Sequence, residues 1–208
     1  LHGLPITIKD AIATEGIRST GGSVTLADHV PTIDAPAVAT LKQAGAIVFG
    51  KTNLPEWSGK LQSYNELFGT TNNPWDVTRS PGGSSGGAAA AVSMGFTSFE
   101  LGTDLGGSVR VPSAYCGVFG HKPSFGLIPT LGYVDSTEGG SVEEVDINTF
   151  GPIARSARDL DLLVQLLAGP GDERRVAWRV ELPPAEIDDL AGLRVAVWLG
   201  DDALPCDD

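Results

Sequence analysis

The sequence contains few cysteine, histidine and methionine residues, with two, three and one respectively among its 208 residues. The two cysteines, Cys116 and Cys206, lie far apart and lack the spacing of metal ligands. This pattern favours a reducing, cytoplasmic compartment over a disulfide-bonded or zinc-binding chain. The acidic segment from Thr137 to Asn148 offers no histidine that a transition-metal site would use, so we expect no metal and no cofactor.

Basic residues are also scarce, because 14 Lys and Arg stand against 26 Asp and Glu and give a formal net charge of −12. A nucleic-acid-binding surface needs clustered Lys and Arg, and the chain has no such cluster, so we expect no nucleic-acid partner. No apolar run reaches the roughly 20 residues of a membrane-spanning helix, and no basic and apolar leader opens the chain. The sequence therefore predicts a soluble protein with no membrane partner.

Glycine and proline are abundant, with 27 and 14 residues, and 41% of the chain is hydrophobic. This composition is typical of a loop-rich α/β enzyme, and the length is sufficient for one sizeable core. Ser84 and Ser108 each follow a pair of glycines, in the segments 80–87 and 102–110. Without a Cβ the backbone can approach a ligand closely and direct amide groups at it, which suits an exposed nucleophile.

Other interpretations of the first glycine-rich segment fit less well. A flexible Gly/Ser linker would not run directly into helix formers, as happens from Ala88 to Val92. A phosphate-binding loop would end in Gly-Lys-Ser/Thr, and no lysine stands there. A nucleophile elbow matches Gly82 to Gly86 literally, but turn residues precede it where a strand is needed, and His121 is the one histidine after it.

Three motifs together are similar to those of the amidase signature family of serine amidohydrolases. They read Gly-Leu-Pro-Ile-Thr-Ile-Lys-Asp at 3–10, Ser-Pro-Gly-Gly-Ser-Ser-Gly-Gly at 80–87, and Leu-Gly-Thr-Asp-Leu-Gly-Gly-Ser-Val-Arg-Val-Pro-Ser-Ala-Tyr-Cys-Gly at 101–117. Gly-His-Lys-Pro-Ser-Phe-Gly at 120–126 continues the likeness. The resemblance covers about residues 3 to 169, and three linked motifs in order are more specific than one glycine-rich loop.

The resemblance implies a Ser-Ser-Lys site, in which Ser108 is the acylated nucleophile, Ser84 relays its proton, and a neutral Lys9 is the base. It also implies a cis peptide bond between Gly83 and Ser84. A neutral lysine needs a pKa well below the usual value of about 10.4, chiefly through burial. This predicts activity that rises towards alkaline pH.

By the same resemblance, backbone N–H groups from residues 105–108 would form the oxyanion hole. Further residues match positions that line the pocket or brace these loops. The oxyanion or substrate set is Ser84, Leu105, Gly106, Gly107, Ser108 and Ser58, and the supporting set is Gly83, Ser85, Asp104 and Arg110. Cys116 and His121 are interpreted as structural.

The expected function is hydrolysis of a small carboxylic acid amide to the acid and ammonia or an amine, and a homodimer is compatible with it. One alternative is the A subunit of an amidotransferase, which works with a glutamyl-tRNA partner. Such subunits tend to carry Gln after the arginine of the nucleophile motif, whereas Val111 stands here. The other alternative is a non-catalytic truncated fragment.

The expected fold is α/β, with a mixed β-sheet core covered by helices, present here as one partial amidase signature domain over 1–208. Strands are predicted over 4–8, 46–49, 96–101 and 193–198, and helices over 34–45, 88–92, 109–115 and 156–169. The strand over 46–49 is predicted to be fully buried. Residues 170–191 are linker-like.

Overall fold

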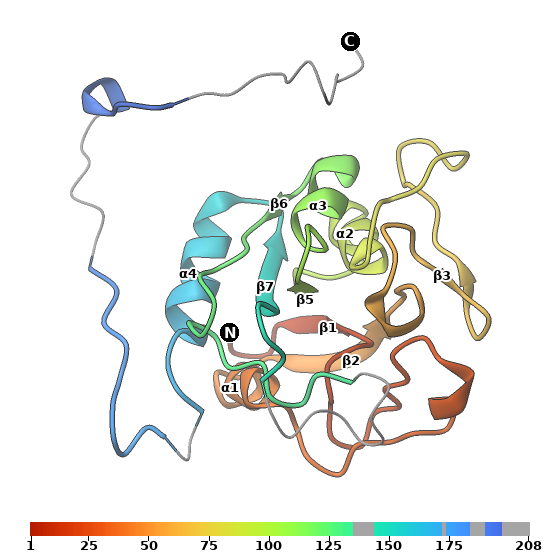
Figure 1. Cartoon of the computed structure of the whole chain (residues 1–208), viewed down its shortest axis with the longest axis horizontal. Helices are drawn as coiled ribbons and strands as arrows, with labels where there is room; N and C mark the ends of the chain where they lie inside the picture. The colour runs from red at the N-terminus through yellow and green to blue at the C-terminus, as the bar shows by residue number, and fades with distance from the viewer. Residues whose placement is uncertain (135–143, 172–173, 184–189, 197–208) are drawn as a thin grey trace.

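A five-stranded mixed sheet forms the centre of the molecule (Figure 1). The computed structural model describes residues 1–134, 144–171, 174–183 and 190–196. The strand order is β2-β1-β5-β7-β6. In chain order the strands are β1 (Pro5–Lys9), β2 (Ile47–Thr52), β5 (Phe99–Asp104), β6 (Phe119–Gly120) and β7 (Thr149–Ala154). Strand β1 pairs in parallel with β2 and β5, and β7 runs antiparallel to β5 and β6. The predicted mixed α/β fold is confirmed.

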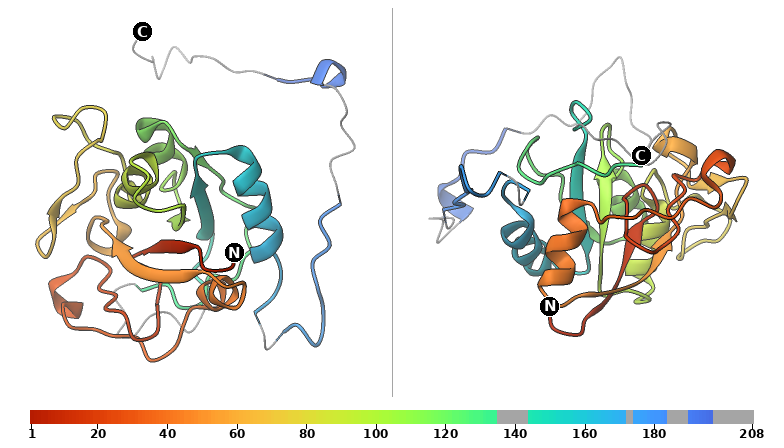
Figure 2. Two further views of the ribbon diagram at one scale, coloured as in Figure 1. Left: turned by 180° about the vertical axis from the view of Figure 1, so that it is seen from behind. Right: turned by 90° about the horizontal axis from the view of Figure 1, so that it is seen from below.

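Two pairs of helices cover the two faces of this sheet (Figure 2). Helices α1 (Pro36–Gln43) and α4 (Ala157–Leu167) pack with one face of β1 and β5 in the main hydrophobic core. Helices α2 (Gly86–Ser93) and α3 (Arg110–Cys116) lie against the other face. Because side chains alternate along a strand, Ile6 and Ile8 enter the main core while Thr7 and Lys9 belong to the α2 side.

The remaining regular elements are short. A hairpin pairs β3 (Tyr64–Asn65) with β4 (Gly69–Thr70). Three 3₁₀ turns span Val24–Leu26, Glu56–Ser58 and Leu190–Gly192. No helix in the described ranges is both long and apolar enough to cross a membrane.

Most elements lie where the sequence predicts them, with shifted boundaries. The strand that carries Lys9 and the helix capped by Ser156 are both present, and Ser156 Oγ accepts a hydrogen bond from Asp159 N at 3.1 Å. Strand β5 continues past the predicted end at Gly102 as far as Asp104. No strand is assigned to 193–196, and 197 and 198 lie outside the described residues, as does 137–143 of the acidic segment.

The prediction that the strand after α1 is fully buried is wrong. Ile47 is 56% exposed and Phe49 is 55% exposed, because β2 is the outermost strand of the sheet in the described structure. An apolar sequence run marks a strand but does not say whether neighbours cover both of its faces.

Candidate active site

Strand β1 carries Lys9 into the interior at its carboxyl end. The side chain is fully buried, and Nζ donates hydrogen bonds to Ser84 Oγ at 2.6 Å and to Thr103 Oγ1 at 2.7 Å. Burial lowers the pKa of Lys9 from 10.5 to about 7, although the negative charges of Asp104 and Glu100 oppose this shift. Burial of this amine therefore favours its neutral form.

The glycine-rich loop holds Ser84 against this amine. The peptide bond between Gly83 and Ser84 is cis, which confirms the prediction. A Cβ on Gly83 would lie 2.8 Å from the carbonyl carbon of Leu61. Only glycine therefore allows these two segments of the backbone to pack this closely. Ser63 Oγ holds the glycine-rich loop at two points, because it donates to the carbonyl of Gly82 at 3.0 Å and accepts from Gly86 N at 3.0 Å.

Ser108 lies between β5 and α3, where the preceding turn is held by one carboxylate. Asp104 is buried and accepts hydrogen bonds from Gly107 N at 2.8 Å and Val109 N at 3.0 Å. The Arg110 guanidinium also bonds this carboxylate, with Nη2 at 2.9 Å from Oδ1. Burial alone would raise the pKa of Asp104, but the hydrogen bonds from Arg110 and the backbone lower it to about 2. Asp104 and Arg110 therefore hold this turn through hydrogen bonds, and their supporting role in catalysis stays a prediction.

This bracing changes the predicted set of oxyanion donors. The Gly107 amide already donates to Asp104 and so is not available to a substrate. Among the described residues, the amides of Leu105, Gly106 and Ser108 have no hydrogen-bond partner. Leu105 and Gly106 are exposed and Ser108 is half-buried, so solvent or a ligand can reach this turn.

The two predicted catalytic serines are linked through the backbone. Ser85 N donates to the Ser108 carbonyl at 3.1 Å, and Ser85 Oγ donates to the Thr103 carbonyl at 3.3 Å. Ser85 therefore connects the glycine-rich loop both to the turn that carries Ser108 and to β5. Within the described part of the chain, no hydrogen bond joins the Ser84 and Ser108 side chains, so the relay between them stays a prediction. Catalytic hydrogen bonds often form only when substrate is bound.

Ser58, the remaining residue of the predicted pocket set, lies in a strained turn. Both Trp57 and Ser58 have left-handed backbone angles, with φ of 53° and 55°, which non-glycine residues seldom adopt. Ser58 Oγ is buried and has no hydrogen-bond partner among the described residues. Strain and an unsatisfied hydroxyl are compatible with the predicted pocket role, which stays a prediction.

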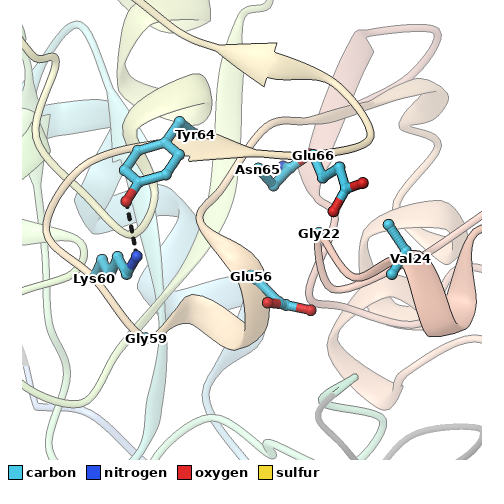
Figure 3. A pocket seen from close by; sticks show the side chains of 8 residues that line it. All are labelled: Gly22, Val24, Glu56, Gly59, Lys60, Tyr64, Asn65 and Glu66. Carbon is cyan, nitrogen blue, oxygen red and sulfur yellow. Dashed lines mark hydrogen bonds between the residues drawn. The ribbon is translucent and has the colours of Figure 1, made fainter.

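A cleft of about 200 Å³ opens beside the same turn (Figure 3). It is lined by Gly22, Val24, Glu56, Gly59, Lys60, Tyr64, Asn65 and Glu66. Lys60 Nζ donates to the Tyr64 hydroxyl at 2.7 Å within it. None of the three predicted catalytic residues lines this cleft.

A family model described as "Amidase" matches residues 1–207. The chain belongs to the amidase signature family. The A subunit of glutamyl-tRNA(Gln) amidotransferase from Saccharolobus solfataricus is 47% identical over 174 residues, which cover 84% of this chain and 35% of that protein. The same subunit from Sulfurisphaera tokodaii is 42% identical, over 95% of this chain and 40% of its own length.

Solved structures of the family show the same fold. The A subunit of glutamyl-tRNA(Gln) amidotransferase from Thermotoga maritima superposes with a TM-score of 0.77 at 37% identity, covering 86% of this chain and 39% of that chain. The chain therefore spans well under half the length of these amidase signature relatives.

Sequence reasoning missed the neighbours of Lys9 in this amidase signature chain. Thr103, on β5, is the second hydrogen-bond acceptor for the Lys9 amine. Glu100, also on β5, is a fully buried carboxylate. The sequence feature that could have revealed Glu100 is a glutamate inside an apolar strand segment, Phe-Glu-Leu-Gly at 99–102. A glutamate in such a segment indicates a buried carboxylate that needs hydrogen-bond or charge partners.

The two residues interpreted as structural have surroundings that suit that role. Burial raises the pKa of Cys116 to about 11, so its thiol is not activated. His121 is exposed, and its ring forms no hydrogen bond with any residue that the structure describes. In those same ranges, no group of three or more His, Cys, Asp and Glu residues could hold a metal ion.

Proposed function

We propose that the protein cleaves a carboxylic acid amide through an acyl-enzyme on Ser108. The observation that carries this proposal is the buried contact of 2.6 Å between Lys9 Nζ and Ser84 Oγ, in a site where the lysine pKa is about 7. A buried amine that hydrogen-bonds a serine hydroxyl is suited to accept its proton. Family membership supports the same chemistry.

The reaction would run in two stages. Lys9 takes the proton of Ser84, Ser84 takes that of Ser108, and Ser108 Oγ attacks the amide carbonyl carbon. Amides of the turn before α3 hold the negative oxygen of the tetrahedral intermediate. The proton returns to the leaving nitrogen as the C–N bond breaks, which releases ammonia or an amine. Water then attacks the ester, with the same groups moving its proton, and frees the acid.

The named relatives favour a role as an amidotransferase subunit over a role as a stand-alone amidase. The relatives at 42% and 47% identity are each named as the A subunit of glutamyl-tRNA(Gln) amidotransferase. In that setting the ammonia released at Ser108 would go to a glutamyl-tRNA partner, so the expectation of no nucleic-acid partner would not hold for the whole assembly. Val111 in place of glutamine, and likeness to the peptide amidase from Stenotrophomonas maltophilia at 35% identity and a TM-score of 0.74, support the stand-alone alternative.

Two measurements separate these settings. Co-purification with partner subunits, together with ammonia release from glutamine that depends on glutamyl-tRNA, would establish the amidotransferase. Hydrolysis of small amides by the isolated full-length protein, with no stable partners, would establish the stand-alone amidase. A cytoplasmic location accompanies both proposals.

Covalent labelling tests the nucleophile. After treatment of the full-length protein with a fluorophosphonate, peptide mass spectrometry should find the adduct on Ser108. Ser108→Ala should abolish labelling, and Ser124→Ala, at an exposed serine in a turn, should not change it. An adduct on Ser84 instead, or none in a protein that unfolds cooperatively, would refute the proposal. A denaturation curve with no cooperative transition would support the non-catalytic fragment.

A further inference from the structure

Glu100 is a buried carboxylate that the proposed mechanism does not use. Its side chain is fully buried, and it is the second residue of β5. Thr7 Oγ1 donates a hydrogen bond to Oε2, and Thr52 Oγ1 donates one to Oε1 at 2.6 Å. Both donors are neutral hydroxyls, and a buried carboxylate held in this way keeps its charge only with support from cations nearby.

The sheet register places this carboxylate beside the predicted base. Glu100 stands directly opposite Thr7 on the neighbouring strand β1. Lys9 follows Thr7 by two residues, so both side chains leave the same face of β1. That face lies under α2, a helix that packs closely because it is built from glycine and alanine up to Val92.

The charged groups around the pair come from a few elements. Helix α2 and strand β7 contain no ionisable side chain. Strand β2 contributes Lys51, whose Nζ is already bound to the Ile12 carbonyl, to Thr14 Oγ1 and to Ser19 Oγ. The other charges are Asp104, which is paired with Arg110; Asp10, which is bonded to Thr20; and Arg155, which is bonded to two carbonyls. Of the cations, Lys9 is the one whose protonation the proposed chemistry must change.

We propose that Glu100 is a positioning residue that sets the pH at which Lys9 becomes a neutral base. This inference rests on the proposed function only in giving Lys9 that role. While Glu100 is ionised, it favours the ammonium form of Lys9, which cannot accept a proton from Ser84. When Glu100 carries a proton, the amine loses this support and becomes neutral more easily.

The titration ranges of the two groups overlap. Burial raises the pKa of Glu100 to about 7, although hydrogen bonds from Thr52 and Thr7 and the charges of Lys51 and Lys9 oppose this. Lys9 titrates near the same pH, with a pKa of about 7. Two interacting sites with similar values titrate as a pair, so a change at one moves the apparent pKa of the other.

Glu100→Gln removes the charge and keeps the shape of the side chain. Without the negative charge, Lys9 should lose its proton at lower pH, so the rising limb of the acylation rate against pH should move down by on the order of one pH unit. Thr52→Val removes one hydroxyl donor from the carboxylate, which favours the protonated acid, and should shift the limb in the same direction by less. Asp161→Asn, on the exposed side of α4, is the matched control and should leave the profile unchanged.

Two readouts in the full-length protein separate this inference from the proposed function. The first is the fluorophosphonate acylation rate from about pH 5 to 10, in which the limb should shift while the alkaline plateau stays near wild type. The second is the NMR titration of the Lys9 side-chain ¹³Cε signal, assigned by its loss in Lys9→Met, which requires no activity.

The outcomes are distinct. A lower Lys9 titration midpoint in both variants supports the inference, even if the wild type is never acylated and the proposed function fails. An unchanged or raised midpoint in a folded Glu100→Gln protein overturns it, and if that variant does not fold, an unchanged Thr52→Val midpoint does so. A lower plateau with no shift of the limb shows a purely structural role and also overturns it.

Discussion

Lys9→Met should slow the acylation of Ser108 by at least about 10²-fold, because removing a positioned general base typically costs that much or more. Methionine is close to lysine in length and carries no ionisable group, so it fills the same buried space under α2. His121→Ala should leave the acylation rate close to that of wild type. The fluorophosphonate labelling rate of each variant, measured at one pH on the plateau, gives the comparison.

The pH dependence follows from the same amine. Lys9 acts as a base only when neutral, and its pKa is about 7, so acylation by the wild type should rise with pH through about 7 and then level off. A rising limb that belonged instead to His121 would disappear in His121→Ala. The residual acylation of Lys9→Met should show no such limb.

A stability measurement on the same variant checks the burial of this amine. The unfolded chain keeps the Lys9 proton up to its pKa of 10.5, whereas the folded chain releases it at a pKa of about 7. Between these values the unfolded state binds one more proton, so this group makes folding more favourable as pH rises, by about 1.4 kcal/mol per pH unit. The free energy of unfolding of wild type, minus that of Lys9→Met, should increase over this range.

If the difference in the free energy of unfolding between wild type and Lys9→Met does not change with pH, Lys9 is solvated or protonated in the folded protein. It could not then act as the neutral base, whatever the labelling shows. Fast acylation of Lys9→Met together with slow acylation of His121→Ala would replace the proposed site by a Ser-His-Asp arrangement.

Local sequence patterns were sufficient to predict the parts of the site that lie within single segments. Lys9 ends a short β-branched strand, Ser84 follows two glycines before an alanine-rich helix, and Ser108 precedes a helix. In each case the neighbouring residues determine the local conformation. The contact between Lys9 and Ser84 was expected from the resemblance alone, because no local pattern brings together residues so far apart in the chain.

The features that sequence reasoning missed depend on pairing between segments. The partners of Glu100 come from β1 and β2, and the register that aligns Thr7 with Glu100 cannot be read from either strand alone. The use of the Gly107 amide by Asp104 depends on how the turn closes. The exposure of Phe49 depends on β2 having no further neighbour among the described strands.

Gly87→Ala tests whether the glycine-rich loop serves close packing or flexibility. Gly87 lies in the first turn of α2, and its amide donates to the Asn53 carbonyl at 3.1 Å. A Cβ here would lie 2.5 Å from both the nitrogen and the oxygen of Asn53 and 3.0 Å from its Cα. All three atoms are backbone, so no side chain can rotate to relieve the clash.

Asn53 itself is firmly held, because its Oδ1 accepts from Asn65 Nδ2 at 2.6 Å and its Nδ2 donates to Thr71 Oγ1 at 3.0 Å. We therefore expect Gly87→Ala to destabilise the fold by about 3 kcal/mol, as overpacking a rigid contact does. The displaced helix start should also move Ser84 away from Lys9 and slow acylation. Chemical denaturation gives the free energy of unfolding.

Gly50→Ala is the matched control, since its Cβ would meet only Thr7 Cγ2 at 3.8 Å, an ordinary contact. Its stability should remain within about 0.5 kcal/mol of wild type. A flexible linker would respond with the opposite sign at Gly87, because alanine is the better helix former by about 1 kcal/mol and restricts the unfolded chain. The sign of the change at Gly87 therefore decides whether these glycines are there for close backbone approach, which the proposed position of Ser84 requires.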